Sequence, residues 1–398
     1  MFDFTKEQLE WRDAVRDFIA GLDPGSRAEN VHVASELKGD NTWLAQLRRK
    51  GWLGIGWPRE YGGLGKSIVE QWILIDELTA AGLPRLGDGV NMIGPAIIEV
   101  ASEQMKRDWL PRILSGEVEF ALGYSEPEAG TDLARLRTRA VPDGDEFVIN
   151  GQKTWNSSGH FATHEWLAVR TDPDAPAREG ISILIVPIDS PGITVSPIWT
   201  WGGARTNDVF FDNVRVPRAN LVGELNKGWS YVMTALNLER FAIGGVGELR
   251  AQLPVLVRFL ASTFRGGRTL WDDPRVRERI ADLASRLHAA RLLSLRNVRL
   301  IDRGEVSAAE SSMVKVWASE LRMEFADTVT EILGAAGQLT AGDRRAPLRG
   351  EYEHLYRKAS HYRFTGGTNE IQRDLIARRG LGLPRQSVGR RGSPTPKN

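Results

Sequence analysis

One glutamate in the C-terminal half of the chain has only apolar helical neighbours. In "VMTALNLERFAIGGVGEL" apolar side chains recur every three or four residues and so share one face of a predicted helix. Glu239 falls inside that series, three residues after Leu236 and four before Ile243. Arg240 points about 100° away around the helix and is not assumed to pair with it. Two interpretations are open. In the first, a tertiary ion pair or a position at the margin of the apolar stripe offsets the cost of the Glu239 charge. In the second, burial raises the pKa of Glu239, and the carboxylate is suited to removing a weakly acidic proton.

A pair of glycines near the C-terminal end raises a second question. The stretch "HYRFTGGTNEIQR" (361–373) contains Gly366 and Gly367 directly before a helix-like run. A glycine-rich turn that opens a helix can bind an anion on its backbone N–H groups. The same turn can also be a tight connection and nothing more.

Two motifs in the middle of the chain combine small, hydroxyl and aromatic residues. The first is "LGYSEPEAGTDLARLRT" (122–138), in which backbone N–H groups and hydroxyls on a turn can approach the polar edge of a heterocycle. The second is "INGQKTWNSSG" (149–159), which places the indole of Trp155 two residues before the hydroxyl of Ser157.

The elements around these motifs fall into three regions. From Thr5 to about Ser115 the apolar spacing is mostly helical, and Thr5 with Gln8 predicts a capping box. A Gly/Pro-rich interruption covers 51–65, and Pro111 predicts a bend or break in a later helix.

The middle region consists of short β-type runs, and the region after it is helical again. Asp143-Gly144 and Asn150-Gly151 are hairpin signals within a compact all-β domain. The segments predicted to form a helical bundle are 229–264, 274–303, 307–334 and 350–364. We place the domain limits at 1–118, 119–225 and 226–385, and we expect 386–398, which is rich in Pro, Gly, Ser and basic residues, to form a disordered tail.

Composition excludes several classes of protein. The 398 residues are 41% hydrophobic, enough for a sizeable core, and the formal net charge of +1 offers no basic field for nucleic acid. The absence of cysteine excludes disulfides, a thiolate nucleophile and a cysteine-ligated metal, and six histidines without a paired motif give no support for a metal site. We expect a cytoplasmic protein that does not bind membranes, since no secretory signal or membrane-length apolar run is present.

The motifs resemble those of the acyl-CoA dehydrogenase family. The core of the resemblance is Tyr124-Ser125-Glu126-Pro127 followed by Ala129-Gly130-Thr131-Asp132, and "INGQKTWNSSG", "FDNVRVPRANLVGELNKGW" and "GGTNEIQRDLIARRGLGLP" follow in the family's order. The resemblance covers essentially the whole chain. It implies an α+β fold with an N-terminal helical domain, a β-barrel-like middle domain and a C-terminal four-helix bundle. It also implies FAD as the cofactor and α,β-dehydrogenation of an acyl-CoA thioester to the trans-2-enoyl-CoA.

The resemblance also implies roles for individual residues. Leu122, Tyr124 and Ser125 would meet the flavin ring edge, and Thr131 would lie near both the cofactor and the thioester. Trp155 and Ser157 would flank the isoalloxazine. The residues expected on the other side of the cofactor, at the start of a helix, are Gly366, Gly367, Thr368 and Glu370.

The family keeps its catalytic base at one of two places. In many relatives the base stands in a Tyr-Glu-Gly-Thr sequence, and aligning that sequence here places Gly366 where the glutamate would be. A minority, including isovaleryl-CoA and some long-chain or branched-chain enzymes, carry the glutamate on the first helix of the bundle, before an arginine. That pattern matches Glu239-Arg240, so the resemblance implies Glu239 as the base and Arg240 as a supporting residue near the substrate.

Two departures concern contacts that a subunit gives to its neighbour's flavin. Homotetrameric relatives carry Arg-x-x-Phe-Gly, whereas 262–274 keeps Arg265 and Arg268 but lacks Phe-Gly. The family's Gln-x-x-Gly-Gly-x-Gly has Glu331 for Gln and Ala335 for Gly. The pattern resembles catalytic subunits of actinobacterial two-plus-two heterotetramers that degrade sterol side chains.

The resemblance implies a bulky or branched acyl group and an electron acceptor of the electron-transfer flavoprotein type. Two alternatives remain open at this point. One is a non-catalytic scaffold subunit of a heteromeric dehydrogenase, and the other is a flavin oxidase or monooxygenase on the same fold.

Overall fold

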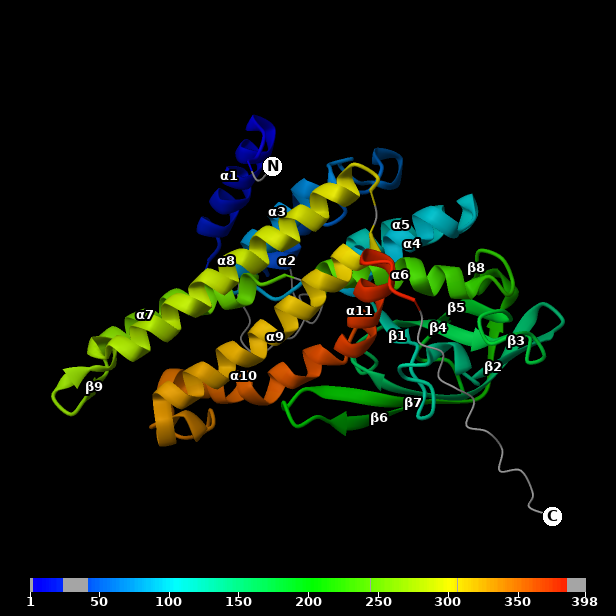
Figure 1. Cartoon of the computed structure of the whole chain (residues 1–398). Helices are drawn as coiled ribbons and strands as arrows, with labels where there is room; N and C mark the ends of the chain where they lie inside the picture. The colour runs from blue at the N-terminus through cyan, green and yellow to red at the C-terminus, as the bar shows by residue number, and fades with distance from the viewer. Residues whose placement is uncertain (1–2, 24–41, 244, 306, 385–398) are drawn as a thin grey trace, which may run out of the picture.

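The computed structural model describes residues 3–23, 42–243, 245–305 and 307–384, and the side chains of 237–243 are outside that description. The chain is a mixture of helices and one large sheet (Figure 1). N-terminal helices precede the sheet in the chain, and long helices follow it, as the sequence predicts. The predicted tail, 386–398, lies outside the described residues.

The N-terminal region is helical. Its α-helices are α1 (Lys6–Ala20), α2 (Trp43–Arg49), α3 (Ile68–Ala80), α4 (Gly94–Val100) and α5 (Glu103–Ser115), with a π-helical turn η4 (Gly89–Ile93) before α4. The capping box of Thr5 and Gln8 is confirmed. Of the bend or break expected at Pro111, the break is wrong, because α5 runs through this residue. Pro111 and Arg107 are both exposed, so water can reach the carbonyl that the proline leaves without its helical donor.

The middle region forms an eight-stranded sheet. Its strands are β1 (Phe120–Gly123), β2 (Arg139–Asp143), β3 (Glu146–Asn156), β4 (His164–Arg170), β5 (Ile181–Pro187), β6 (Ile193–Trp199), β7 (Arg205–Pro217) and β8 (Leu221–Val222). The order is β6-β7-β3-β2-β4-β5-β8, and β1 pairs in parallel with β4. The two segments that carry the cofactor motifs, β1 and β3, therefore belong to one sheet.

The two hairpin signals have different outcomes. Asp143 pairs with Glu146 across a tight turn in which Gly144 has φ 59°, as predicted. The prediction at Asn150-Gly151 is wrong, because β3 continues through it with a shift of register. Gly151 has φ 150°, and a Cβ there would lie 2.6 Å from the hydroxyl of Thr138, so the glycine serves a bulge and a close approach.

The C-terminal region is a set of long helices. They are α6 (Gly228–Ile243), α7 (Gly247–Ser262), α8 (Pro274–Asp302), α9 (Ala308–Leu333), α10 (Glu351–Ala359) and α11 (Asn369–Leu375), with a short β9–β10 hairpin (Phe264–Arg265 and Arg268–Thr269) between α7 and α8. The single helix expected over 229–264 is two helices, because the Gly-Gly pair before Val246 has low helix propensity.

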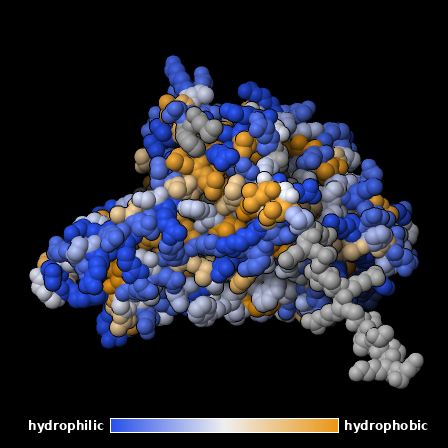
Figure 2. Space-filling view, in the orientation of Figure 1, coloured by the Kyte–Doolittle hydropathy of each residue, from blue (hydrophilic) through white to orange (hydrophobic). Residues whose placement is uncertain are grey.

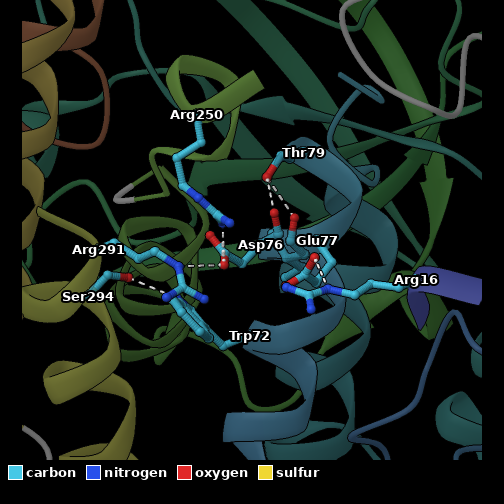
Figure 3. Close-up of polar contacts among 9 residues, drawn as sticks. Arg16, Trp72, Asp76, Glu77, Thr79, Arg250, Arg291 and Ser294 are labelled. Carbon is cyan, nitrogen blue, oxygen red and sulfur yellow. Dashed lines mark hydrogen bonds and ion pairs between the residues drawn. The ribbon is translucent and has the colours of Figure 1, made fainter. Parts of the chain in front are cut away.

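A buried polar cluster joins the N-terminal region to the bundle (Figure 3). Asp76 of α3 is only 6% exposed and accepts from Arg250 Nη1 of α7 at 2.6 Å and from Arg291 Nε of α8 at 2.9 Å. Beside it, the indole N–H of Trp72 donates to the hydroxyl of Ser294 at 2.9 Å. A carboxylate at this depth is tolerated because two guanidiniums compensate it.

The outer face of the bundle carries an apolar groove. Figure 2 shows apolar residues gathered near the middle of the face in view, while hydrophilic residues cover most of the long helices. The groove between α8, α9 and the π-helical turn η11 (Ile376–Gly380) after α11 is lined by Leu293, Met313, Trp317 and Ile376, among others. Trp317 is 41% exposed there.

Candidate active site

The signature loop that follows β1 is held in place by hydrogen bonds from a buried lysine. Lys153 is fully buried and donates through Nζ to the carbonyl of Tyr124 at 3.1 Å and to Glu126 Oε1 at 2.7 Å. The hydroxyl of Tyr124 accepts from the indole N–H of Trp166 at 3.0 Å. These bonds connect the start of the loop to strands β3 and β4.

Glu126 closes the far end of the same loop. Its carboxylate accepts from the backbone N–H of Arg137 at 2.6 Å and of Thr138 at 2.9 Å. Burial alone would raise the pKa of Glu126, but Lys153 and the two N–H groups outweigh burial and hold this pKa below its usual value. Burial lowers the pKa of Lys153 against the opposing effect of Glu126. The loop is therefore a rigid support with its charge paired beneath it.

Trp155 projects from a bulge in β3 next to this loop. The register of β3 against β7 shifts between Lys153 and Asn156, and Trp155 has φ 59°. Its side chain is 61% exposed although its neighbours Thr154 and Asn156 are buried. The backbone N–H of Thr154 donates to the carbonyl of Ser125 at 2.8 Å, so the bulge and the signature loop are in direct contact. Bulges often re-aim a side chain beside an active site.

The groups around Trp155 have the chemistry that a flavin needs. Thr131 and Ser157 are exposed, Ser125 is partly buried, and within the described chain none of these three hydroxyls makes a hydrogen bond. Leu122, partly buried, precedes the loop at the end of β1. An exposed indole and unengaged hydroxyls on two segments in contact fit a flat ring system with a polar edge, so the residues on this side suit FAD.

The bundle side of the site is a glycine turn that leads into α11. Gly366 has φ 64° and Gly367 has φ 86°. Thr368 caps the helix, since its side chain accepts from the N–H of Ile371. Glu370 is exposed and lies 3.8 Å from Arg363. With its own threonine as the cap and only seven residues, α11 is better described as a tight connection than as an anion cradle.

Buried amides behind this turn connect it to α9. Gln372 is fully buried, donates to the carbonyls of Gly366 at 3.2 Å and Gly367 at 3.4 Å, and accepts from the hydroxyl of Ser312 at 2.7 Å. Asn369 Oδ1 accepts from Lys315 Nζ at 2.7 Å.

The sequence analysis assigned no role to these buried residues. Asn369 and Gln372 stand three apart, the spacing of one helix face, and that is the signal that could have found them. On the β side, Glu126 and Lys153 stood inside the quoted motifs without a role.

The helix that carries Glu239 packs between the sheet and the bundle. α6 contacts β5, η4 and α9. Val232 and Ala235 of α6 are fully buried in one apolar cluster with Tyr124 of the signature loop. Position 239 lies on the same helix face, about one turn beyond Ala235. The side chains of Glu239 and Arg240 lie outside the described residues, so their roles stay predictions.

The two segments that depart from the family pattern make contacts within this chain. Arg265 donates through Nη2 to the carbonyl of Leu333 at 3.0 Å and through Nη1 to that of Ile332 at 3.4 Å, at the C-terminal end of α9. Glu331 pairs with Arg279 at 2.6 Å. Both side chains thus satisfy groups of their own bundle.

Two searches for other kinds of site concern the described residues alone. No group of three or more His, Cys, Asp and Glu side chains there could hold a metal ion. None of the helices in the same ranges has the length and apolar character needed to cross a membrane.

Comparison with known proteins identifies the family. Three family models match in succession: "Acyl-CoA dehydrogenase, N-terminal domain" over 5–117, the middle domain over 121–214 and the C-terminal domain over 226–381. The chain belongs to the acyl-CoA dehydrogenase family. It is therefore an FAD-dependent oxidoreductase that dehydrogenates acyl-CoA thioesters, as the resemblance predicted.

Individual relatives match along nearly their whole length. FadE26 of Mycobacterium tuberculosis, an acyl-CoA dehydrogenase, is 41% identical and covers 96% of this chain and 98% of its own. FadE29 of the same organism is 37% identical with the same coverage. Among solved structures, the "Tcur3481-Tcur3483 steroid ACAD" has a TM-score of 0.87 at 39% identity over 96% of this chain and 99% of its own. The ChsE4-ChsE5 complex from Mycobacterium tuberculosis has 0.86 at 39% identity over 97% and 100%.

Proposed function

We propose that this dehydrogenase binds the flavin between the signature loop with Trp155 and the turn before α11. The bulged, exposed Trp155 in contact with a charge-paired loop is the observation that carries this proposal. Leu122, Tyr124, Ser125 and Ser157 complete the β side. The residues proposed on the bundle side are Gly366, Gly367, Thr368 and Glu370.

Glu239 is the proposed base. Gly366 has no side chain that could accept a proton, and its φ of 64° is one that a glutamate adopts at a cost. Position 239 lies on the α6 face that carries Val232 and Ala235, which are buried in the apolar cluster that also contains Tyr124 of the signature loop. An apolar setting raises the pKa of a carboxylate toward that of a useful base.

The chain's own groups handle the proton and the alignment of the thioester. The Glu239 carboxylate takes the α-proton, while Thr131 and Arg240 help to place the thioester. FAD supplies the hydride acceptor for the β-hydrogen when it is bound. The redox chemistry is thus the cofactor's, and the protein contributes the base and the geometry.

Glu239→Gln tests the base. It should leave FAD bound and slow substrate-dependent bleaching of the flavin absorbance by about 10²–10⁴-fold, the usual contribution of a general base. Glu278→Gln, the same change on an exposed face of α8, is the control and should bleach normally. Full-rate bleaching by Glu239→Gln would remove the assignment.

The domain limits follow the ends of the elements. We propose 1–118, 119–225 and 226–385, supported by the end of α5 at Ser115, the start of β1 at Phe120 and the start of α6 at Gly228. We also propose a cytoplasmic location.

A heteromeric assembly with a homologous chain is the proposed oligomer, an α2β2 tetramer. Arg265 and Glu331, at the positions with which relatives reach a neighbouring flavin, are engaged inside this chain. Phe264 beside Arg265 is 71% exposed, and the groove around Trp317 offers a further apolar surface. Two similar structures, ChsE4-ChsE5 and Tcur3481-Tcur3483, are named as pairs of chains.

Flavin counting tests the assembly. The chain co-expressed with a homologue from a neighbouring gene should purify as a mixed complex with more FAD per copy of this chain than the chain alone. One FAD per chain in a homomer of this chain would overturn the proposal.

An electron-transfer flavoprotein is the proposed acceptor, and fast oxidation of the reduced flavin by oxygen would instead indicate an oxidase.

The substrate is proposed to be a bulky acyl-CoA of the steroid side-chain or branched type. One similar structure is named as a steroid enzyme. With the base on α6, position 366 in the turn before α11 is a glycine, which leaves more room for a large acyl group than a glutamate would. A panel of acyl-CoA thioesters should show higher kcat/KM for steroid or branched chains. A preference for short straight chains would overturn this part.

Matches over nearly the full chain to acyl-CoA dehydrogenases disfavour the scaffold alternative.

A further inference from the structure

A fully buried carboxyl group lies beneath the proposed flavin site without a role in the chemistry. Glu165, on β4, is fully buried, and the amide Nδ2 of Asn156 donates to its two oxygens at 2.9 and 3.0 Å. The same Nδ2 lies 3.3 Å from the carbonyl of Leu122. Asn156 therefore connects three strands, β3, β4 and β1, at one point.

Asn156 is also held through its backbone. Asn207 of β7 is fully buried, and its Nδ2 donates to the carbonyl of Asn156 at 2.7 Å. One residue before the bulged Trp155, the N–H of Thr154 donates to Ser125. Trp155 is thus fixed on both sides by bonds that its own side chain does not make.

Two glycines leave room for these groups. A Cβ at Gly123 would lie 2.9 Å from Glu165 Oε2, and a Cβ at Gly159 would lie 2.7 Å from Asn156 Oδ1. Real Cβ atoms essentially never approach a neighbour below 3.0 Å. Glycine at these two positions therefore leaves the space that the side chains of Glu165 and Asn156 occupy.

The conformation of Trp155 needs such support. A φ of 59° is rare and unfavourable for a bulky residue, so it persists only where the surroundings impose it. Released from this conformation, the indole would no longer project from the bulge that contacts the signature loop.

We propose that Glu165 and Asn156 form a buried clamp that positions Trp155 against the flavin. Both are positioning residues, since they act through Trp155. The proposal rests on the flavin contact proposed for Trp155. It differs from a purely structural role because it predicts an effect on the indole and on FAD affinity, beyond any effect on stability.

The test compares two substitutions of Glu165 in the full-length protein, purified with any partner chain. Glu165→Gln keeps an oxygen that accepts from Asn156, whereas Glu165→Leu has a similar size and no acceptor. Asn156→Ser is a second way to break the clamp if Glu165→Leu fails to fold. The readouts are the dissociation constant of FAD from the apoprotein and the emission of Trp155, obtained by subtracting the same variant carrying Trp155→Phe.

We expect Glu165→Leu and Asn156→Ser to weaken FAD binding by about tenfold, equivalent to about 1.4 kcal/mol, and to shift Trp155 emission. Glu165→Gln should keep the FAD affinity and the Trp155 emission of the unmodified protein. Unchanged FAD affinity and unchanged emission in the two disruptive variants, with only a lower Tm, would overturn the clamp. If Trp155→Phe itself leaves FAD binding unchanged, the flavin contact fails, and the emission of Trp155 alone then decides the clamp.

Discussion

The two sides of the proposed flavin site are both anchored by a fully buried lysine, but with different partners. On the β side, Lys153 pairs with the carboxylate of Glu126 under the signature loop. On the bundle side, Lys315 donates to the amide oxygen of Asn369 and to the carbonyl of Arg363 at 3.0 Å. The anchor on the β side includes an ion pair, and the two bonds described on the bundle side run to an amide oxygen and a backbone carbonyl.

This difference matches what each side presents to the cofactor. The β side holds a large side chain, Trp155, in a costly backbone conformation, which calls for strong and redundant support. The bundle side presents two glycines, Gly366 and Gly367, whose left-handed conformations cost little. A region that stores strain needs more stabilisation than a region that avoids it.

The largest expected effect is the loss of the charged anchor. Lys153→Met leaves the buried carboxylate of Glu126 without its cation and should lower the free energy of unfolding by about 3–5 kcal/mol. Urea denaturation measures it. Lys106→Met, which breaks the more exposed pair with Glu103, is the control and should cost only about 0–1 kcal/mol. Equal losses in the two variants would contradict the comparison.

The next effect is a pH dependence that belongs to the β side. Burial raises the pKa of Glu165 from 4.5 to about 7, against the smaller opposing effects of Asn156 and Lys153. The folded state therefore holds this proton more tightly than the unfolded state does. The stabilisation is complete below pH 4.5 and is lost as pH rises to about 7, by roughly 3 kcal/mol.

Glu165→Gln provides the matched reference for this titration. Denaturation of both proteins between pH 5 and about 8 should show the stability of the native protein falling relative to that of the variant. A constant difference over this range would show that Glu165 does not titrate with a raised pKa.

A smaller effect is expected when the buried amide network on the bundle side is broken. Gln372→Leu removes the donor to the carbonyls of Gly366 and Gly367 and the acceptor for Ser312, and should cost about 1–3 kcal/mol. Thermal denaturation measures the cost, and Gln104→Leu on an exposed helix face is the control. A loss as large as that of Lys153→Met would show that the two anchors are equivalent.

The smallest effect concerns the segment that departs from the family. Arg265→Ala removes the cation at the C-terminal end of α9 and should cost about 1 kcal/mol. Because we propose that this side chain serves its own bundle, FAD per complex should stay unchanged. Loss of flavin in this variant would show that Arg265 contacts a neighbouring subunit's FAD, as the matching arginine does in homotetrameric relatives.

Much of the fold could be predicted because it depends on local patterns. The three regions, the Thr5 capping box and the turn at Gly144 follow from periodicity and from residues whose conformational preferences act over a few positions. Where local patterns conflicted with distant packing, the prediction failed. Asn150-Gly151 has the composition of a turn, but pairing with β7 and the close approach of Thr138 make it a bulge.

The sequence by itself determined the family, the cofactor and the candidate base, since motifs such as Tyr124-Ser125-Glu126 and Glu239-Arg240 are contiguous. Only the tertiary structure decided that Lys153 and Glu165 are buried and that Trp155 has a positive φ. Glu165 begins a run that reads as an ordinary strand, and its burial comes from the parallel pairing of β4 with β1, 44 residues earlier in the chain. Burial and strain are set by neighbours that are distant in the sequence, so no local pattern records them.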